Sequence, residues 1–327
     1  MKAVTPDGQF LFGKHEAPLT TLDFHLADLS DVAAWWGRPQ MGWLGQTVRR
    51  MRLKKWHYLS ATHPDFYLCA AIADLGYVGN TFCYLVDRRS GRKFETESLR
   101  PLGWGVQVGG NSRAESLARG IRIAHLDNRW LCELDLNLEG KSLRAEVSFP
   151  AGRPLCLLHP LHRNRGAYTH KEIGEPCSGW VEWNNEKFTV EGAFGGLDYT
   201  HSYADRRTNW KWLFLTGSLV DGRRFGLNLS ELLYGSAENY LWLGGCLHAL
   251  GEAHFSSPKE GSWEISGERM QLAFQPLGKR EQNVNLFLVR SQFVQPYGEA
   301  AGTLCCEGEA LEIASAFGVA EDHRAVW

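Results

Sequence analysis

The sequence predicts an all-β protein of sandwich or barrel type. Apolar and polar residues alternate with a period of two over long stretches, Gly- and Asp-rich turns separate these stretches, and helical signals are few. With 327 residues, 44% of them hydrophobic, the chain is long enough for two domains or one large β-rich unit. Its 13 tryptophans suit a barrel interior or an apolar ligand pocket, because indole side chains are large and flat.

The clearest predicted hairpin spans residues 132–149. Apolar residues occupy every second position on both sides of Glu139-Gly140, which predicts a two-residue turn. This turn predicts two cross-strand pairs, Leu136 with Leu143 and Asp135 with Arg144. One face of the hairpin is then apolar, and the other carries a pair of opposite charges.

A second hairpin is predicted over residues 210–229, with a type I′ turn at Asp221-Gly222. The strand before the turn has Trp210, Trp212, Phe214 and Thr216 on one face. The turn sets three residues of the return strand, Phe225, Leu227 and Leu229, against Ser218, Thr216 and Phe214. Leu213 and Leu215 make the reverse face partly apolar, which is typical of a strand covered on both sides.

The same alternation predicts further strands at residues 56–61, 66–73, 81–87, 240–243, 270–274, 284–290 and 293–303. Apolar residues with helical spacing between Leu26 and Trp36 predict one helix, which Pro39 would end. Pro, His, Arg and Gly interrupt the alternation between Pro154 and Cys177, so this segment is the best linker candidate.

Two similar β domains are predicted from a weak internal repeat. Aromatic residues recur two positions apart after Lys55 and again after Asn209, and further strands follow each pair. We expect an N-terminal domain at residues 1–175 and a C-terminal domain at residues 176–327.

Charge and composition argue against binding to nucleic acid or insertion into a membrane. The net charge is −2, and basic residues are interleaved with acidic ones. No apolar run approaches the ~18–20 residues of a membrane span. The chain starts without the apolar segment of a signal peptide, and its eight cysteines show no CxxC motif. We therefore expect a cytoplasmic protein with free thiols.

Ionisable residues concentrate between residues 198 and 207, directly before the Trp210 strand. Neighbouring apolar strands could exclude water from such a group. We interpret three of these residues as candidate catalytic groups: Asp198, His201 and Asp205. Six others are candidate ligand contacts: Tyr199, Tyr203, Arg206, Trp210, Trp212 and Phe214.

This residue set suits acid catalysis. A carboxylic acid kept neutral by burial, or an imidazolium held by a carboxylate, can deliver a proton to carbon. Tryptophan faces stabilise developing positive charge by about 0.5–2 kcal/mol each. Asp198 or Asp205 would be the acid, with His201 as its partner and Trp210 and Trp212 as walls. Alternatively, these residues form a structural hydrogen-bond network and the indoles belong to the core.

The sequence favours neither a metal site nor a cofactor. His159-Pro-Leu-His162, with His170 nearby, has the His-x-x-His spacing but lacks a third ligand motif. Gly109-Gly110 does not precede an evident helix, so a phosphate-binding loop is not indicated.

Four motifs resemble the DUF2804 family, a bacterial family of unassigned function, and the similarity runs over most of the chain. These motifs are Arg52-Leu-Lys-Lys-Trp-His-Tyr58, Ile72-Ala-Asp-Leu-Gly-Tyr77, Asn209-Trp-Lys-Trp212 and Gln292-Phe-Val-Gln-Pro-Tyr-Gly298.

The centre of the chain is also similar to the AttH and carotenoid 1,2-hydratase group, to which tocopherol cyclases are related. Three features carry the likeness: Gly179-x-Val181…Phe188-x-Val190-x-Gly192, His201, and Trp210-x-Trp212. His201 matches the motif histidine, but Thr200 replaces the motif aspartate, Tyr203 the motif tryptophan and Ala204 the following glycine. The resemblance implies two lipocalin-like β domains that meet around residues 175–210, and cofactor-free chemistry on hydrophobic molecules.

We therefore expect the protein to bind or transform a hydrophobic small molecule, such as an isoprenoid, a fatty acid or a polyketide. The reaction expected from the resemblance is that of a hydratase, cyclase or isomerase. A carrier or sensor for the same class of ligand is an alternative, as is a structural scaffold whose interior is filled by its own side chains.

Overall fold

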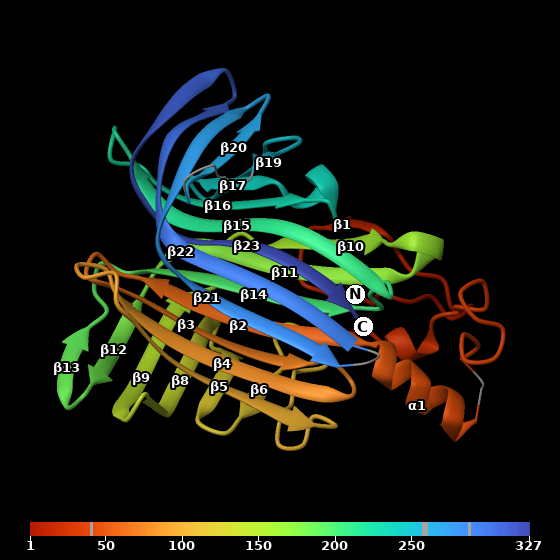
Figure 1. Ribbon diagram of the computed structural model, residues 1–327. Coiled ribbons are helices and arrows are strands. Elements are labelled where there is room, and N and C mark those ends of the chain that lie inside the picture. The colour runs from red at the N-terminus through yellow and green to blue at the C-terminus, as the bar shows by residue number, and fades with distance from the viewer. Residues whose placement is uncertain (40–41, 257–260, 287–288) are drawn as a thin grey trace. The chain divides into compact units, whose positions relative to one another are not determined.

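The computed structural model describes residues 1–39, 42–256, 261–286 and 289–327. These residues form three large, mainly antiparallel sheets (Figure 1), which confirms the predicted all-β class. The chain comprises two compact units. The N-terminal unit contains Met1–His63, Leu68–Leu85 and Phe94–Asp205, and the C-terminal unit contains Pro64–Tyr67, Val86–Lys93 and Arg206–Trp327. The division into two folding domains at residue 176 stays a prediction.

Two sheets make up most of the N-terminal unit. The first has eight strands in the order β1-β10-β11-β14-β2-β3-β4-β5. These are β1 (Gly13–His15), β2 (Lys54–Thr62), β3 (Phe66–Asp74), β4 (Val78–Asp87), β5 (Lys93–Pro101), β10 (Leu155–Pro160), β11 (Gly166–Pro176) and β14 (Phe194–Ser202). The second has six strands in the order β13-β12-β9-β8-β7-β6. These are β6 (Ser116–Ala118), β7 (Ile121–Leu126), β8 (Arg129–Leu138), β9 (Lys141–Pro150), β12 (Ser178–Trp183) and β13 (Glu186–Thr189).

The two sheets pack against each other through large buried rings. A Cβ atom on Gly195 of β14 would lie 2.1 Å from the Cδ1 atom of Phe149 in β9, so the close approach of the ring requires glycine. Trp130 of β8 is fully buried, and its ring centroid lies 6.0 Å from that of His57 in β2 and 5.6 Å from that of His170 in β11. The interior of this unit is therefore aromatic but also rich in polar groups.

The C-terminal unit contains one sheet of nine strands in the order β18-β17-β16-β15-β23-β22-β21-β20-β19. These are β15 (Arg207–Leu219), β16 (Arg224–Glu231), β17 (Tyr240–Leu243), β18 (Cys246–Ala249), β19 (His254–Ser256), β20 (Trp263–Gly267), β21 (Met270–Leu286), β22 (Val289–Cys306) and β23 (Glu309–Val326). One face of this sheet carries an apolar core that includes Leu213, Leu227, Phe274 and Leu304.

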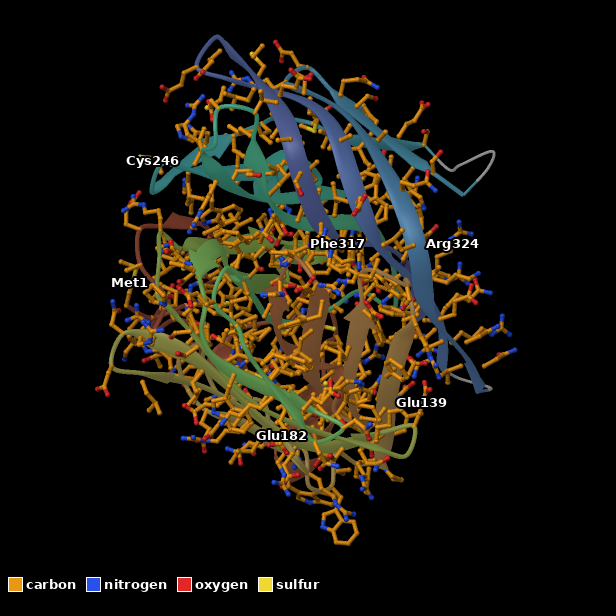
Figure 2. All side chains as sticks on the ribbon, turned by 90° about the vertical axis from the view of Figure 1, so that its left-hand side faces the viewer. Met1, Glu139, Glu182, Cys246, Phe317 and Arg324 are labelled. Atoms are coloured by element: carbon orange, nitrogen blue, oxygen red, sulfur yellow. The ribbon has the colours of Figure 1, made fainter. Side chains whose placement is uncertain are left out.

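The predicted hairpin around Glu139 is confirmed in both turn and register. Leu136 pairs with Leu143, and Asp135 pairs with Arg144. Glu139 and Gly140 both have positive φ, 52° and 88°, as a type I′ turn requires. Figure 2 shows Glu139 at this turn.

The predicted register of the second hairpin is wrong by one residue. Leu215 pairs with Leu227, and Phe214 pairs with Asn228. Only Gly222 of the two turn residues has positive φ, at 85°, so the turn is not type I′. The amide of Leu219 donates to the carbonyl of Arg223, which closes a longer loop with Gly222 in the left-handed position.

This turn geometry gives a testable contrast between its two residues. Gly222→Ala should lower the free energy of unfolding by about 1 kcal/mol, because the left-handed conformation disfavours a Cβ atom. Asp221→Gly should also destabilise, since Asp221 accepts a 2.8 Å hydrogen bond from the amide of Arg223. Urea unfolding of both variants measures these effects. A stabilised Asp221→Gly variant would instead indicate a type I′ turn.

The helix predicted between Leu26 and Trp36 is wrong. Only Phe24–Leu26 forms a short 3₁₀ helix (η1), and turns follow it. Backbone carbonyls of this segment accept hydrogen bonds from the guanidinium of Arg49, where a helix would pair them with its own amides. Arg49 donates to the carbonyl of Gly37 at 2.8 Å and to that of Ala27 at 2.6 Å. Arg49 lies in α1, a helix at Trp43–Arg52 that the sequence analysis did not predict. Two more 3₁₀ helices are η2 (His162–Asn164) and η3 (Gly235–Glu238).

The linker predicted between Pro154 and Cys177 is also wrong, because β10 and β11 occupy it. Most residues of β11 are buried, and its buried polar side chains have hydrogen-bond partners, as His170 has in Glu172 and Lys171 has in Asp198 of β14. Because polar residues occupy buried positions, β11 lacks the usual alternation of apolar and polar residues. The strand predicted at 284–290 is divided between the end of β21 at Leu286 and the start of β22 at Val289, and residues 287–288 lie outside the described residues. The other predicted strands are confirmed within β2, β3, β4, β17, β21 and β22.

Candidate functional site

The candidate residues of β14 do not all point the same way. Side chains alternate along a strand, so Tyr199 and His201 lie on one face of β14 and Asp198 lies on the other. The structure therefore does not bring Asp198 and His201 together. All three side chains are buried.

Asp198 belongs to a compact ion pair on its own face of the sheet. Its Oδ1 atom accepts a 2.7 Å hydrogen bond from the ammonium of Lys171, its neighbour on β11. Its Oδ2 atom accepts a 3.3 Å hydrogen bond from the indole of Trp56 in β2. Both members of the pair are buried, so this carboxylate has a fixed cationic partner.

Asp205 and Tyr203 bind the segments next to β14. Asp205 forms an ion pair with the guanidinium of Arg165, which also donates to the carbonyl of His162 at 3.1 Å. The hydroxyl of Tyr203 donates to the carbonyl of Phe24 at 3.2 Å. Both candidate residues therefore have partners in the N-terminal unit.

His201 has one ring nitrogen engaged and one free. Its Nδ1 atom lies 3.2 Å from the hydroxyl of Tyr199, and that hydroxyl donates its single proton to the carbonyl of Gly109 at 2.9 Å. Nδ1 must then carry the imidazole proton and donate to the Tyr199 oxygen. The Nε2 atom is left as a buried acceptor with no hydrogen-bond partner in the described part of the chain. Burial, with smaller contributions from Lys55 and His25, lowers the pKa of His201 to about 3.

His57 flanks Tyr199 on β2, where the two residues are cross-strand partners. Its Nδ1 atom lies 2.9 Å from the hydroxyl of Ser116, which also accepts a hydrogen bond from the amide of Gly109. Burial, and to a lesser extent the nearby His170, lowers the pKa of His57 to about 3. Its Nε2 atom has no partner among the described residues.

His170 flanks Tyr199 on the other side, in β11. Its Nε2 atom donates to Glu172 at 2.8 Å, and its Nδ1 atom lies 2.7 Å from the hydroxyl of Ser112. Glu172 also accepts a 2.7 Å hydrogen bond from the amide of Gly152. Serine, histidine and glutamate thus form a continuous buried chain of hydrogen bonds.

Six aromatic side chains around Tyr199 and Trp130 are linked by ring contacts, and we call this set the buried imidazole cluster. Its members are His57, His125, His170, His201, Tyr199 and Trp130. The ring centroid of Trp130 lies 4.7 Å from that of His125, and the ring centroid of Tyr199 lies 5.4 Å from that of His57. Burial is the main cause of a lowered pKa at His125. In the described ranges, four buried ring nitrogens of the cluster lack a partner: Nε2 of His57, His125 and His201, and Nε1 of Trp130.

Unpaired buried polar atoms are costly, at about 1–3 kcal/mol each. Buried polar atoms in folded proteins are almost always hydrogen-bonded, so four unpaired ring nitrogens in one cluster require an explanation. The cluster is therefore the strongest candidate for a functional site in the N-terminal unit. Within the described residues, no three His, Cys, Asp or Glu side chains are grouped as metal ligands are.

The sequence analysis identified Tyr199 and His201 of this cluster but not its other members. His57 lies within a predicted strand but is not among the candidate site residues, and His170 falls within the predicted linker. A usable signal was the alternation itself, since His57 and His170 occupy positions next to Tyr199 once β2, β14 and β11 are paired. That pairing cannot be obtained from local patterns, because the three strands are far apart in sequence.

The remaining candidates lie in the C-terminal unit. The indole of Trp210 donates to Glu321 at 2.6 Å, and the indole of Trp212 donates to Asn228 at 2.7 Å. Phe214 is buried, and its ring lies 5.0 Å from that of Trp212. The guanidinium of Arg206 donates to the carbonyl of Trp327. Both indole N–H groups are therefore engaged by side chains of the nine-stranded sheet.

Large antiparallel sheets in this arrangement define a lipocalin-like β protein, and solved structures share this fold. Kievitone hydratase from Nectria haematococca matches with a TM-score of 0.53 and 7% identity, over 84% of this chain and 88% of that one. A putative AttH from Nitrosomonas europaea matches with a TM-score of 0.51 and 12% identity, over 84% of this chain and 92% of that one. At these identities the likeness establishes the fold alone.

The chain belongs to the DUF2804 family, a domain of unknown function, whose model matches residues 19–327. This confirms the resemblance found in the sequence. Among curated proteins, none matches the chain with significant similarity. None of the helices in the described ranges has the length and apolar character needed to cross a membrane.

Proposed function

We propose that the protein binds a small hydrophobic molecule with an oxygen function at the buried imidazole cluster and transforms it without a cofactor. The observation that carries this proposal is the presence of four buried ring nitrogens without partners in one cluster. They differ in kind: Nε2 of His201 is an acceptor, whereas Nε1 of Trp130 is a donor. A ligand with a carbonyl or hydroxyl group and an apolar body would satisfy such groups.

The proton-transfer group in this proposal is His201. Its lowered pKa keeps the imidazole neutral near pH 7, so it acts first as a base. Its Nε2 atom takes a proton from a carbon next to a carbonyl, the electron pair of the C–H bond forms a double bond to the carbonyl carbon, and the C=O π pair moves onto the oxygen to give an enolate. The hydrogen bond between Nδ1 and Tyr199 holds the ring in position.

The fate of that proton defines the reaction class. If Nε2 returns it to another carbon, the substrate is isomerised. If it goes to a hydroxyl group that leaves as water, the substrate is dehydrated, and the reverse reaction is a hydration. The fold shared with kievitone hydratase supports this reaction class. In this scheme Asp198 and Asp205, which are paired with Lys171 and Arg165, do not transfer protons.

A carrier of the same class of ligand is the second candidate. It is favoured by the full burial of Ser112, His170 and Glu172, whose side chains already satisfy one another. A carrier needs enclosure and polar contacts but no group that changes its protonation state.

The test is mass spectrometry of the purified full-length protein, first native and then after denaturing extraction. We expect a bound apolar molecule containing oxygen. In His201→Gln, the bound material should differ from that in the wild type, by the mass of one water for a hydratase or by structure at equal mass for an isomerase. The matched control is His254→Gln, because His254 is exposed.

The outcomes separate the candidates. Identical bound material in the wild type and His201→Gln would favour the carrier. Protein that is empty after purification, and that takes up no added long-chain enone or hydroxy ketone, would contradict both candidates.

A further inference from the structure

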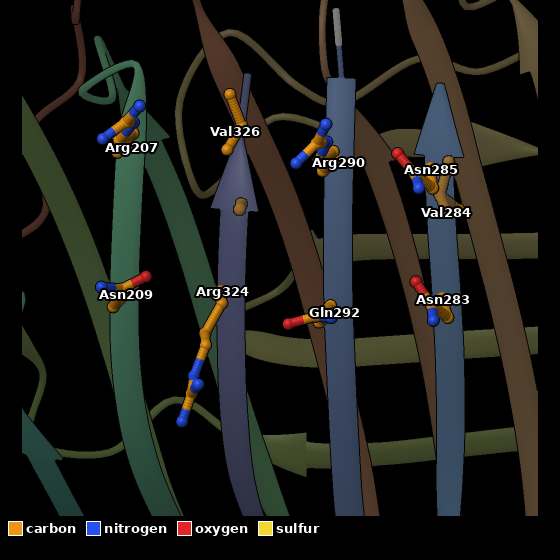
Figure 3. Close-up of a pocket in the computed structure, with 10 residues that line it drawn as sticks. Arg207, Asn209, Asn283, Val284, Asn285, Arg290, Gln292, Arg324 and Val326 are labelled. Atoms are coloured by element: carbon orange, nitrogen blue, oxygen red, sulfur yellow. The ribbon is translucent and has the colours of Figure 1, made fainter. Parts of the chain in front are cut away.

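A cationic surface on the C-terminal unit is separate from the imidazole cluster. Four neighbouring strands, β15, β23, β22 and β21, present two cross-strand rows of side chains on one face (Figure 3). The first row is Arg207, Val326, Arg290 and Asn285, and the second row is Asn209, Arg324, Gln292 and Asn283. These side chains line a hollow of about 360 Å³, and we call this surface the arginine face.

The arginine face carries more positive than negative charge. Arg207, Arg290 and Arg324 are all exposed, and Arg324, labelled in Figure 2, lies on β23, the middle strand of the sheet. Among the described residues, the ion pair found for these three is a 3.6 Å contact between Arg324 and Asp322. No carboxylate is among the described residues that line the hollow.

Some arginines of the protein are placed differently. The exposed Arg223 makes short contacts with both Asp221 and Glu309, at 2.6 Å each. The half-buried Arg122 lies between two glutamates, Glu115 and Glu133. On the arginine face, by contrast, no ion pair is found among the described residues for Arg207 or Arg290, and Arg324 has a single acidic partner, Asp322.

The carboxamides of the arginine face point to recognition as well. Asparagine is depleted in strands, yet Asn209, Asn283 and Asn285 all lie within strands here. Asn209 and Gln292 are the cross-strand neighbours of Arg324. Amide N–H₂ groups add hydrogen-bond donors beside the guanidinium forks, which suits an oxyanion better than a neutral ligand.

The backbone beneath this face is held from the opposite side of the sheet. His323 directly precedes Arg324 on β23, and its side chain lies on the opposite face of the sheet. The centroid of its ring lies 4.2 Å from that of Trp210 and 5.3 Å from that of Phe293. Arg207 and Arg290 are two strands apart, so their Cα atoms lie about 10 Å from each other. At this separation, the guanidinium groups of Arg207 and Arg290 can contact a single bound group from opposite sides.

We propose that the arginine face is a binding site for a phosphorylated small molecule, and that its diphosphate or phosphate group contacts Arg207, Arg290 and Arg324. Guanidinium forks match the geometry of phosphate oxygens, and the hollow is large enough for a diphosphate. This proposal is independent of the function proposed for the imidazole cluster.

The experiment is calorimetric titration of the full-length protein with inorganic diphosphate at low ionic strength. We expect saturable binding with one site per chain that weakens as salt is added. Each of the substitutions Arg207→Gln and Arg290→Gln should weaken binding about tenfold, and the double variant about a hundredfold. Arg223→Gln is the matched control, because it removes an exposed arginine that already has acidic partners.

Three results would overturn the proposal. The first is no binding of diphosphate by the wild type, and the second is an equal loss in Arg223→Gln. The third is a preference for another class of anion. Citrate would then bind as tightly as diphosphate, or a DNA oligonucleotide would bind much more tightly than diphosphate. The substituted side chains are exposed, so unchanged thermal unfolding of the variants shows that the loss is local.

Discussion

Lys171→Met is expected to lower the free energy of unfolding by about 3–5 kcal/mol, because it leaves the carboxylate of Asp198 buried without its cation. In the wild type, the Lys171 ammonium lies 2.7 Å from Asp198, and both side chains are buried. Removal of one member of such a pair lowers the free energy of unfolding by more than the intact pair contributes to it, since the remaining charge is then buried without a partner. Urea unfolding of the variant measures the loss.

The double variant Lys171→Met/Asp198→Leu is the matched control. It removes both charges and replaces them with apolar side chains of similar length, so it should be more stable than either single variant. A double variant less stable than both single variants would contradict this account, and it would return Asp198 to consideration as a functional acid.

The features that were predicted correctly from the sequence are local ones. Alternation identified most strands, and Glu139-Gly140 defined its own turn and register because both residues adopt positive φ. At Asp221-Gly222, by contrast, the residue types alone do not determine the turn type. The same pair of residue types permits two turn geometries, and only the backbone of Asp221 distinguishes them.

The features that were missed depend on contacts between distant segments. The apolar spacing after Leu26 was helical, but the carbonyls of this segment bind Arg49 from another helix. Polar residues of β11 looked like a linker, because their partners lie on other strands. In the candidate site, the opposite orientations of Asp198 and His201 were available from strand alternation alone, whereas the approach of His57 and His170 to Tyr199 required the sheet order.

The protein is also expected to lose stability steeply as the pH falls below about 6, before most carboxylates are protonated. Burial lowers the pKa of His57, His201 and His323 to about 3, whereas a histidine in the unfolded chain has a pKa of about 6.5. The unfolded state therefore binds more protons between these two values. Stability present above pH 6.5 is lost progressively as the pH falls towards 3.

The size of this effect differs between the two units. One extra proton bound on unfolding changes the free energy by about 1.4 kcal/mol per pH unit. His57 and His201 lie in the N-terminal unit and His323 in the C-terminal unit, so the expected slopes are about 3 and about 1 kcal/mol per pH unit. Urea unfolding at pH 7, 6 and 5 measures both slopes, and His201→Gln should reduce the N-terminal slope by one proton. A stability that is flat over this range, or an N-terminal slope unchanged in His201→Gln, would mean that His201 is already protonated in the folded protein. The imidazole could then no longer act first as a base, and the proton transfer proposed for the cluster would have to begin from an acid.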